Sequence, residues 1–415
     1  MTPVVGYTEM RDSGIEWVGE IPAHWTTIAN KYVMRKKKRI CEKWKNQNVL
    51  SLTMNGVVVR DILNPVGKMP TTFDGYQFAY SGELLMCLFD IDVTPRCVGR
   101  VFCDGVTSPA YSCFQLNNHA DLGYYYYYYL MVDNTKELLH LAKNLRHSFT
   151  EEQLGMLKVP FPPFKEQSAI AAYLDSQCAK IDEIIAEAKT SIEDYKQWKA
   201  SIIYEAVTKG LDPNVEMKDS GIEWIGEIPK GWNTCRIKNA TINMDNLREP
   251  ISAENRENKL GLYDYYGASG VIDKIDSYNV DDTVLLIGED GANLKMRNLP
   301  LVYRASGKFW VNNHAHILKV SSNNCYGYIA YLLEAGDYTT YITGSAQPKL
   351  SQFNLMRFPI VVPPISEQIA IEKHLDSICS KIDGLIWEKQ SSITDLETYK
   401  KSLIYEVVTG KRRVC

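Results

Sequence analysis

DSGIEWVGEIPAHW occupies residues 12–25, and the nearly identical DSGIEWIGEIPKGW occupies residues 219–232, which lie 207 positions further along the chain. A period of about half the chain indicates an internal duplication. In both copies, glycines and a proline interrupt a short apolar stretch that contains two tryptophans. We therefore predict a turn-rich clasp that packs its tryptophans onto a neighbouring element in each half. Because the phrase occurs twice, we prefer this prediction to a generic loop that leads into a domain.

Two further segments repeat, now with an offset of 201 positions. PFKEQSAIAAYLDSQCAKID begins at Pro163 and PISEQIAIEKHLDSICSKID at Pro364, while SIIYEAVT begins at Ser201 and SLIYEVVT at Ser402. Between the clasp and the first of these markers, the two halves show little likeness. The pattern predicts a duplicated frame that carries two divergent inserts of similar size. Such a frame suits two-headed recognition better than a single active cleft.

A long stretch without Pro or Gly, from about residue 166 to residue 208, predicts the first of two long helices. Its apolar residues recur every seven positions, as in the seam of a coiled coil, and the second copy repeats the pattern. Ile184, Trp198, Leu385 and Tyr399 also fall on this predicted seam, and Cys178, Ile185 and Ile192 widen it. One helix cannot cover so long a stripe alone, so we expect the two helices to pack against each other in antiparallel orientation. The predicted core and docking residues of helices and clasps are Ile170, Leu174, Ile181, Tyr195, Ile202, Ile371, Leu375, Ile382, Leu396, Leu403, Trp17 and Trp224.

The predicted fold class is α+β: two mixed α/β globular domains are joined by the two long helices, with an internal pseudo-two-fold repeat. Each insert supports this class, because short apolar or alternating runs separated by Gly, Pro, Asn and Asp are typical of strands. The predicted segments are a first globular domain at residues 1–160, a first helix at 161–210, a second globular domain at 211–361, and a second helix with a basic tail at 362–415.

The overall composition is that of a soluble globular protein, with 45% hydrophobic and 23% charged residues. The N-terminus has no apolar signal segment and no uncharged run approaches the length of a membrane span, so we expect a cytoplasmic protein without a membrane partner. The 10 cysteines show no tight metal spacing, which suits reduced thiols. With a net charge of −4, a nucleic-acid partner would have to be met by local basic surface.

Such a local basic surface is present at residues 31–45, which read KYVMRKKKRICEKWK. Tyr32 and Trp44 interleave with the cations, as on a surface that follows phosphates and stacks on bases. The alternative interpretation is a solvated helix face. Six consecutive tyrosines at residues 124–129 also allow two interpretations, a platform on which bases stack or rings that pack against a sheet. We prefer ring packing against a sheet.

The sequence contains few motifs that would indicate catalysis by this chain. It has no GxxxxGK[ST] loop, no GxGxxG, no HExxH and no Asn/Asp-Pro-Pro-aromatic tetrapeptide. Four cysteines between residues 87 and 113 contain no CxxC pair, so we prefer buried thiols to a zinc site. His314 and His316 would share a strand face and are only a weak metal pair. Asp245 with Glu257 and Lys259 fits a nuclease motif loosely. We predict no metal site, no catalytic residues and no bound cofactor, and assign catalysis to another chain.

Taken together, GIEWVGEIPAHW, GIEWIGEIPKGW, PFKEQ, PISEQ and GSAQPKLS (residues 344–351) give the chain a specific resemblance to the specificity subunits of type I restriction–modification systems, over almost its entire length. The resemblance implies two target recognition domains, each reading one half of a bipartite site on double-stranded DNA. It implies that the helices set the spacing and dock two methyltransferase subunits, which restriction/translocase subunits then join. S-adenosylmethionine, ATP and Mg are expected on those partners. The first insert departs from GSAQPKLSQFNL, reading LRHSFTEEQL before its helix.

We select candidate DNA contacts by residue type, with Lys and Arg for phosphates and Arg, Asn, Gln and Ser in loops for bases. The candidates are Arg35, Lys36, Lys37, Lys38, Arg39, Arg146 and His147 in the first domain, and Lys295, Arg297, Asn312, Asn313, Ser345, Gln347 and Lys349 in the second. Two other classes stay open at this point: a self-contained restriction endonuclease, and a two-headed coiled-coil adaptor without a DNA role.

Overall fold

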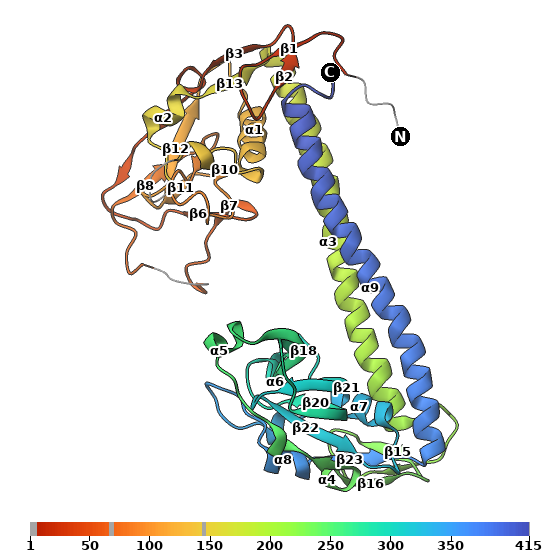
Figure 1. The fold of residues 1–415 in the computed structure, drawn as a ribbon. Coiled ribbons are helices and arrows are strands. Elements are labelled where there is room, and N and C mark those ends of the chain that lie inside the picture. The colour runs from red at the N-terminus through yellow and green to blue at the C-terminus, as the bar shows by residue number, and fades with distance from the viewer. Residues whose placement is uncertain (1–5, 66–69, 143–146, 415) are drawn as a thin grey trace. The chain divides into compact units, whose positions relative to one another are not determined.

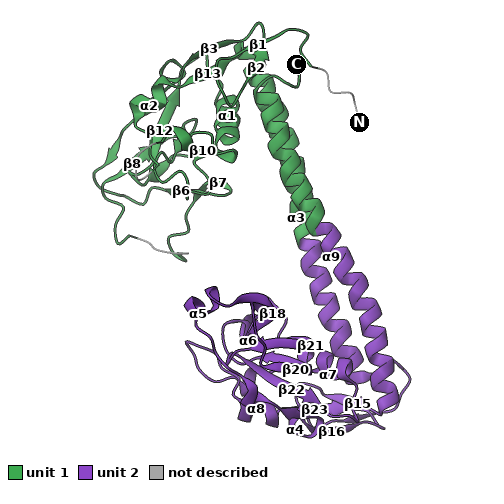
Figure 2. Ribbon diagram, viewed as in Figure 1, with its two compact units in different colours: residues 1–189, 390–415 green, residues 190–389 purple. Residues whose placement is uncertain are grey.

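The computed structural model describes residues 6–65, 70–142 and 147–414. The chain divides into two compact units (Figure 2): unit 1 comprises Met1–Lys189 and Gln390–Cys415, and unit 2 comprises Thr190–Lys389. Each unit therefore contains one insert and one half of each long helix. None of the described helices combines the length and the apolar character that a membrane crossing requires.

The long helices are α3 (Phe164–Lys209) and α9 (Ile365–Val408), and they run antiparallel to each other (Figure 1). In unit 1, Lys400 of α9 contacts Asp182 of α3, and in unit 2, Lys199 of α3 contacts Asp383 of α9. Beyond their C-terminal ends, Gly210 and Gly410 adopt φ angles of 79° and 71°, the left-handed conformation that commonly ends a helix. The predicted pair of packed helices in an α+β fold is confirmed.

The seam between the helices differs from the predicted heptad. Ile185 and Ile192 are buried, whereas Ile184, Trp198 and Tyr399 are each 50% exposed and Leu385 is 40% exposed. An α-helix drifts by about 20° per heptad relative to a strict seven-residue repeat, so the buried stripe moves onto neighbouring positions. Tyr195, Ile202 and Leu396 are accordingly only partly buried. The predicted core residues that are buried are Ile170, Leu174, Ile181, Ile371, Leu375, Ile382 and Leu403.

The globular part of unit 1 contains a four-stranded sheet with the order β10-β9-β12-β4 and a five-stranded sheet with the order β5-β8-β11-β6-β7. Their strands are β4 (Met34–Lys37), β5 (Ile40–Cys41), β6 (Val49–Thr53), β7 (Gly56–Val59), β8 (Tyr76–Ala79), β9 (Leu84–Met86), β10 (Val98–Arg100), β11 (Gly105–Thr107) and β12 (Ser112–Leu116). The strand pairs β1 (Met10–Asp12) with β2 (Glu20–Pro22), and β3 (Thr26–Ala29) with β13 (Lys158–Phe161), lie outside these sheets. The helices are α1 (Leu122–Asn134) and α2 (Glu151–Met156).

Helix α1 begins with the tyrosine run, and five of its six rings are buried. Two of their hydroxyls bond to the long helices: the Tyr124 hydroxyl donates to the Val408 carbonyl of α9, and the Tyr127 hydroxyl donates to the Asp175 carboxylate of α3. The preference for ring packing over an exposed platform is confirmed. The run thus anchors the insert of unit 1 to both long helices.

The globular part of unit 2 is built on one six-stranded sheet with the order β17-β22-β20-β21-β18-β19. Its strands are β17 (Thr241–Asn243), β18 (Leu260–Gly267), β19 (Gly270–Ile275), β20 (Val280–Gly288), β21 (Val302–Val311) and β22 (Ala315–Val320). Outside it, β14 (Met217–Asp219) pairs with β15 (Glu227–Pro229), and β16 (Asn233–Arg236) pairs with β23 (Pro359–Val362). The helices of the insert are α4 (Ile237–Ala240), α5 (Ala253–Glu257), α6 (Asn293–Met296), α7 (Tyr326–Ala335) and α8 (Gln352–Arg357).

The repeated phrase forms the same contact in both units. Trp25 and Trp232 are each 1% exposed, and their indole nitrogens donate to Glu166 at 2.9 Å and to Glu367 at 2.8 Å. These two glutamates occupy the first turns of α3 and α9 and come from the repeated EQ pair. Trp17, the other tryptophan of the first phrase, donates to the Tyr128 hydroxyl. The phrase therefore clasps each insert to the start of a long helix.

A second duplicated contact lies further along each helix. In unit 1, the Arg100 guanidinium contacts Asp175 at 2.7 Å, and in unit 2 the Arg304 guanidinium contacts Asp376 at 3.3 Å. Asp376 also accepts from the Tyr331 hydroxyl, as Asp175 does from the tyrosine run. Both aspartates belong to the repeated LDS triplet. The two inserts have different sheets, yet the same side chains fasten them to the frame.

Candidate nucleic-acid interface

The cations from Arg35 to Arg39 in the basic run of unit 1 lie on β4 or between β4 and β5, and only Lys31 and Tyr32 belong to a short 3-10 helix, Asn30–Tyr32. Residues 34–37 are β4, which pairs with β12 through Lys37 with Cys113 and Arg35 with Gln115. Because side chains alternate along a strand, the cations of this run cannot all project from one face. Arg35 and Lys38 are exposed, and Lys36 and Lys37 are half-buried. Lys36 approaches Glu151 only to 3.9 Å. The alternative of a solvated helix face is therefore wrong.

The other predicted contacts of unit 1 are Arg39, at the end of the cation cluster, and two residues far along the chain, Arg146 and His147. Arg39 makes a 2.8 Å ion pair with the buried Glu83, and its guanidinium lies over the Tyr80 ring at 4.7 Å. Arg146 falls outside the described residues. His147 is half-buried with a φ of 42°, just before the capping box of α2. Arg39 thus has internal partners, whereas Arg35 of β4 and Lys38, which directly follows the strand, are exposed to a ligand.

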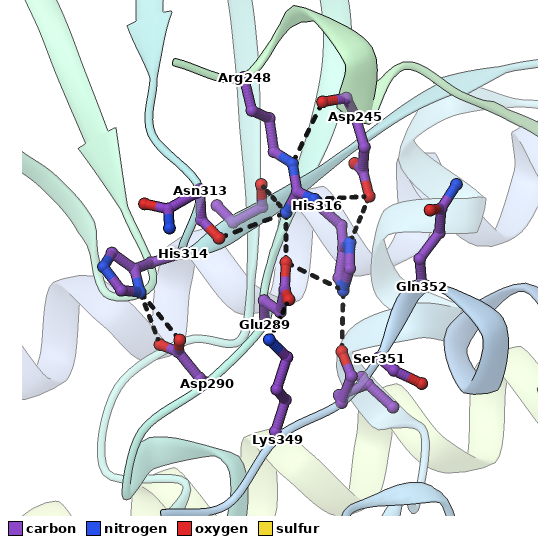
Figure 3. Close-up of polar contacts among 12 residues, drawn as sticks. Asp245, Arg248, Glu289, Asp290, Asn313, His314, His316, Lys349, Ser351 and Gln352 are labelled. Atoms are coloured by element: carbon purple, nitrogen blue, oxygen red, sulfur yellow. Dashed lines mark hydrogen bonds and ion pairs between the residues drawn. The ribbon is translucent and has the colours of Figure 1, made fainter. Parts of the chain in front are cut away.

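In unit 2, a polar network is centred on His316, which lies on β22 and is 0% exposed (Figure 3). Its Nδ1 lies 2.6 Å from Asp245 Oδ2, and its Nε2 lies 2.8 Å from the Leu350 carbonyl oxygen. Both ring nitrogens of His316 thus face oxygen atoms, one of a carboxylate and one of a backbone carbonyl. Burial raises the pKa of Asp245, but the hydrogen bond and charge of His316 outweigh it and hold that pKa below its ordinary value.

Glu289, directly after β20, extends the network. Its carboxylate accepts from the Arg248 guanidinium and lies 2.9 Å from Lys349 Nζ. Arg248 also approaches Asp245 to 3.3 Å. Burial raises the pKa of Glu289, but the hydrogen bonds that it accepts from Lys349 and Arg248 lower this pKa by more. The pKa of Glu289 therefore lies below its ordinary value. Three segments that are distant in the sequence thus meet in a charge-compensated cluster.

The network fixes the loop at residues 344–350. The Leu350 amide donates to the Glu289 carbonyl at 2.7 Å, and the Gly291 amide donates to the Pro348 carbonyl at 3.0 Å. Gly344 has a φ of 84°, and a Cβ there would lie 2.3 Å from the Gln347 carbonyl oxygen, so the tight turn requires glycine. The loop exposes Ser345, Gln347 and Lys349. A rigid base with an exposed polar tip is the arrangement that base readout needs.

A second turn, between β21 and β22, lies beside this loop (Figure 3). Asn313 and His314 are exposed there, and His314 Nδ1 lies 2.8 Å from Asp290, which forms a β-bridge with Lys349. Asn312 is 5% exposed, and its side chain accepts from the His314 amide. Asn312 therefore shapes the turn, while Asn313 is presented to solvent.

The remaining two candidates lie at the C-terminal end of α6, Lys295 within the helix and Arg297 directly after it. Lys295 is exposed. Arg297 has a φ of 53° at the C-terminal end of the helix, and its guanidinium contacts the Glu334 carbonyl oxygen and, at 3.9 Å, the Glu334 carboxylate. Arg297 thus makes an internal contact with α7. Lys295 is the candidate at this end of α6 that is exposed to a ligand.

The weaker chemical interpretations do not fit this geometry. His314 precedes β22 and is exposed, whereas His316 is buried with both nitrogens engaged, so the two rings do not converge on a metal. Within the described ranges, no group of three or more His, Cys, Asp or Glu side chains could hold a metal ion. Asp245 is held by His316 and Arg248, whereas Glu257 and Lys259 are exposed. Cys87, Cys97 and Cys113 are buried and Cys103 is half-buried, as expected for thiols that fill the space between strands.

Arg248, Glu289 and the role of His316 are absent from the sequence-based prediction. Their only local signals are polar residues beside apolar strand runs, such as IGEDG and NNHAHIL. No spacing connects the three positions.

Comparison with known proteins identifies the family. The model of the type I restriction modification DNA specificity domain matches residues 29–194 and again residues 229–394. A putative type I restriction enzyme MjaX specificity subunit of Methanocaldococcus jannaschii is 26% identical over 304 residues, which are 70% of this chain and 68% of that protein. A putative specificity subunit of Haemophilus influenzae is 33% identical over 137 residues, and the match spans 32% of this chain and 34% of that protein.

Two solved structures share the fold. One, from a study of complex assembly and conformational transition of the type I R-M system, aligns with a TM-score of 0.68 at 12% identity and covers 94% of this chain and 98% of its own. The HsdS subunit from Thermoanaerobacter tengcongensis aligns with a TM-score of 0.50 at 14% identity, with the same coverage. Each of the two family matches covers one insert and the first part of the long helix that follows it. This chain belongs to the family of type I restriction–modification DNA specificity subunits, the non-catalytic DNA-recognition subunits of their complexes.

Proposed function

We propose that each globular part of this chain reads one half of a bipartite site on double-stranded DNA, while α3 and α9 set the spacing between the half-sites and dock two methyltransferase subunits. The observation that carries the proposal is the pairing of one duplicated frame with two unlike recognition surfaces. Trp25 with Glu166 and Trp232 with Glu367 hold the inserts in the same way. The exposed polar groups, in contrast, come from residues 35–38 in unit 1 and, in unit 2, from the 344–350 loop, the turn between β21 and β22, and α6.

The two surfaces suit different parts of DNA recognition. The exposed cations Arg35 and Lys38 suit phosphates, and contacts to phosphates fix the register on DNA without reading sequence. In unit 2, Asn313, Ser345 and Gln347 carry amide or hydroxyl groups that can bond base edges in the major groove. Lys295 is exposed and suits phosphates, whereas Lys349 is held by the Glu289 carboxylate. The Glu289 network holds the loop in place before DNA arrives, which lowers the entropy cost of binding.

The helices offer two related apolar surfaces for two copies of one partner. In unit 1, Ile184 and Tyr399 are exposed, and in unit 2, Leu385 and Trp198 are exposed at the positions that the repeat makes equivalent. Trp387, 71% exposed, adds to the surface of unit 2. Exposed apolar side chains that gather into one patch mark interaction sites on proteins. Restriction/translocase subunits then complete the complex. The partner subunits, and not this chain, bind S-adenosylmethionine, ATP and Mg.

The experiment expresses the chain with its methyltransferase subunit in a host that lacks other adenine methylation, and maps the modified adenines by sequencing. The expected result is methylation at a single bipartite motif with a fixed gap. Absence of any motif, together with DNA binding that does not respond to salt, would favour a two-headed adaptor. DNA cleavage by the purified chain with Mg alone would indicate a self-contained endonuclease.

A further inference from the structure

An open groove with a volume of about 570 Å³ lies between α4 and α8 in unit 2. Its lining residues are Arg236, Lys238, Gln352, Phe353, Met356 and Arg357. Three of the six are cations and none is acidic. The groove is therefore strongly positive, although the chain as a whole carries a net charge of −4.

The three cations of the groove have no acidic partner among the residues that the structure describes. Each is exposed, and the Arg357 guanidinium lies over the Phe353 ring at 4.8 Å. Phe353 itself is 65% exposed. Other cations of the same unit are paired, such as Lys319 with Asp282 and Arg256 with Asp273. The charge of the groove is thus available to a ligand outside the chain.

The equivalent surface of unit 1 provides an internal comparison. Arg236 pairs with Pro359 in β16–β23, just as Ala29 pairs with Lys158 in β3–β13. Arg236 therefore occupies the position of Ala29.

The helix α8 occupies the position of α2, so that Gln352, Phe353 and Arg357 replace Glu151, Glu152 and Met156. Lys238 alone has a cationic counterpart, Lys31. The frame does not require the positive charge, which distinguishes unit 2 from unit 1.

We propose that the α4–α8 groove binds the sugar–phosphate backbone of the DNA duplex beside the half-site that unit 2 reads, an inference that rests on the proposed function. Ser351 caps α8 directly after the 344–350 loop, so the candidate reading loop and the groove are continuous along the chain. Guanidinium groups bind phosphate oxygens through two parallel hydrogen bonds. The Gln352 amide sits at the loop end of the groove and donates to Asn243 at 2.8 Å, which fixes it there.

The consequence is that the groove adds phosphate contacts, and therefore salt dependence, to DNA binding by unit 2. Each phosphate contact that is lost makes a plot of log affinity against log salt concentration shallower by about 1. Loss of a phosphate contact also weakens binding to all sequences alike, because the backbone carries no direct sequence information.

The test compares two variants of the full chain in complex with its methyltransferase subunits, on the cognate duplex and on a scrambled duplex. R236Q/K238Q/R357Q removes the groove cations. K230Q/K274Q/K319Q removes the same charge from cations of unit 2 that pair with Glu216, Asp264 and Asp282. We expect the groove variant to lower the salt slope by about 2–3, to weaken binding to both duplexes by the same factor, and to keep its sequence preference. The control should keep its slope, and both variants should unfold at the wild-type temperature.

Three results would overturn the inference. An unchanged slope in a folded groove variant would show that the groove does not contact phosphate. An unchanged slope with loss of a methyltransferase subunit from the complex would assign the groove to a protein partner. A changed sequence preference would make it a base-reading site. Failure of the proposed function is distinguishable, because then the wild-type complex itself would show no preference for any duplex.

Discussion

Lys400 Nζ lies 2.6 Å from both carboxylate oxygens of Asp182, across the pair of long helices. Lys199 makes the same contact with Asp383 at 2.7 Å. The repeat places Asp383 at the position of Asp182 and Lys400 at the position of Lys199. The duplicated sequence thus forms one inter-helix ion pair twice, once in each unit, which is the result expected when two copies of a helix pack antiparallel.

Reversing one charge of this pair should destabilise unit 1 modestly. Asp182→Lys places two cations together, and because both side chains of such a pair are partly exposed, we expect a loss of about 0.5–1 kcal/mol in the free energy of unfolding. The exchange D182K/K400D should restore most of it. Urea unfolding followed by tryptophan fluorescence measures the change. Asp194→Lys, on an exposed position of α3, is the matched control, and equal effects at both sites would show that the pair contributes nothing specific.

The clasp of unit 1 should respond to acid through Glu166. Burial raises the pKa of this carboxylate, but hydrogen bonds from Trp25, His24 and Tyr7 outweigh it, so its pKa lies below the ordinary value of 4.5. A lowered pKa means that the stabilisation is fully present above the unfolded-state value and is lost as pH falls through the folded-state value.

Thermal unfolding between pH 6 and pH 3 tests this expectation. Glu166→Gln should be less stable than wild type at pH 6, and the difference should shrink toward pH 3. Glu152→Gln, an exposed change in the same unit, should follow the wild-type curve. A constant difference at all pH values would exclude the titration of Glu166 as the cause.

Removal of the His316 ring should unfold the candidate reading surface of unit 2. His316→Ala leaves Asp245 buried beside a cavity and without its ring partner, and we expect a loss of about 2–5 kcal/mol. His314→Ala removes an exposed ring and should cost less than about 0.5 kcal/mol. Hydrogen exchange should show the effect of the first variant at residues 344–350. Protection there that equals the wild type would contradict the role of the network in holding the loop.

Two glycines should respond in opposite directions to alanine. Gly384 lies exposed in the middle of α9, and a Cβ at this position would have no atom within 4 Å. Gly384→Ala should therefore raise the free energy of unfolding by about 0.5–1 kcal/mol. A Cβ on Gly123 would lie 2.7 Å from the Cβ of Ala171, where α1 docks on α3, so Gly123→Ala should destabilise. The melting temperatures of the two variants test both expectations. A lower melting temperature in both variants would mean that Gly384 has a function in α9.

The frame could be predicted from sequence because its signals are local and occur twice. The clasp, the EQ pair and the long stretch without Pro or Gly each determine structure within one segment. The seam was predicted less well, since a strict heptad places Trp198 inside and the drift of a real helix places it outside. The basic run was expected at a surface, but its strand conformation depends on pairing with residues 113–116.

The candidate site could be predicted only in part, because it is assembled from distant segments. Arg248, Glu289 and Lys349 are separated by 41 and 60 positions, and only the order of the six-stranded sheet brings them together. The exposure of Ser345 and Gln347 follows from the tight turn at Gly344. The groove cations lie on β16, α4 and α8, which no sequence pattern connects: they are Arg236, Lys238 and Arg357.

The central claim is that two independent reading heads share one frame, and an exchange of one head tests it most directly. Residues 26–159 are replaced by the equivalent segment of a relative with a different target, and the methylated adenines are mapped in a strain that expresses the chimera with the methyltransferase subunit. The account predicts that one half of the recognised motif changes, while the other half and the gap stay as in the wild type. A change in both halves, or in neither, would contradict it.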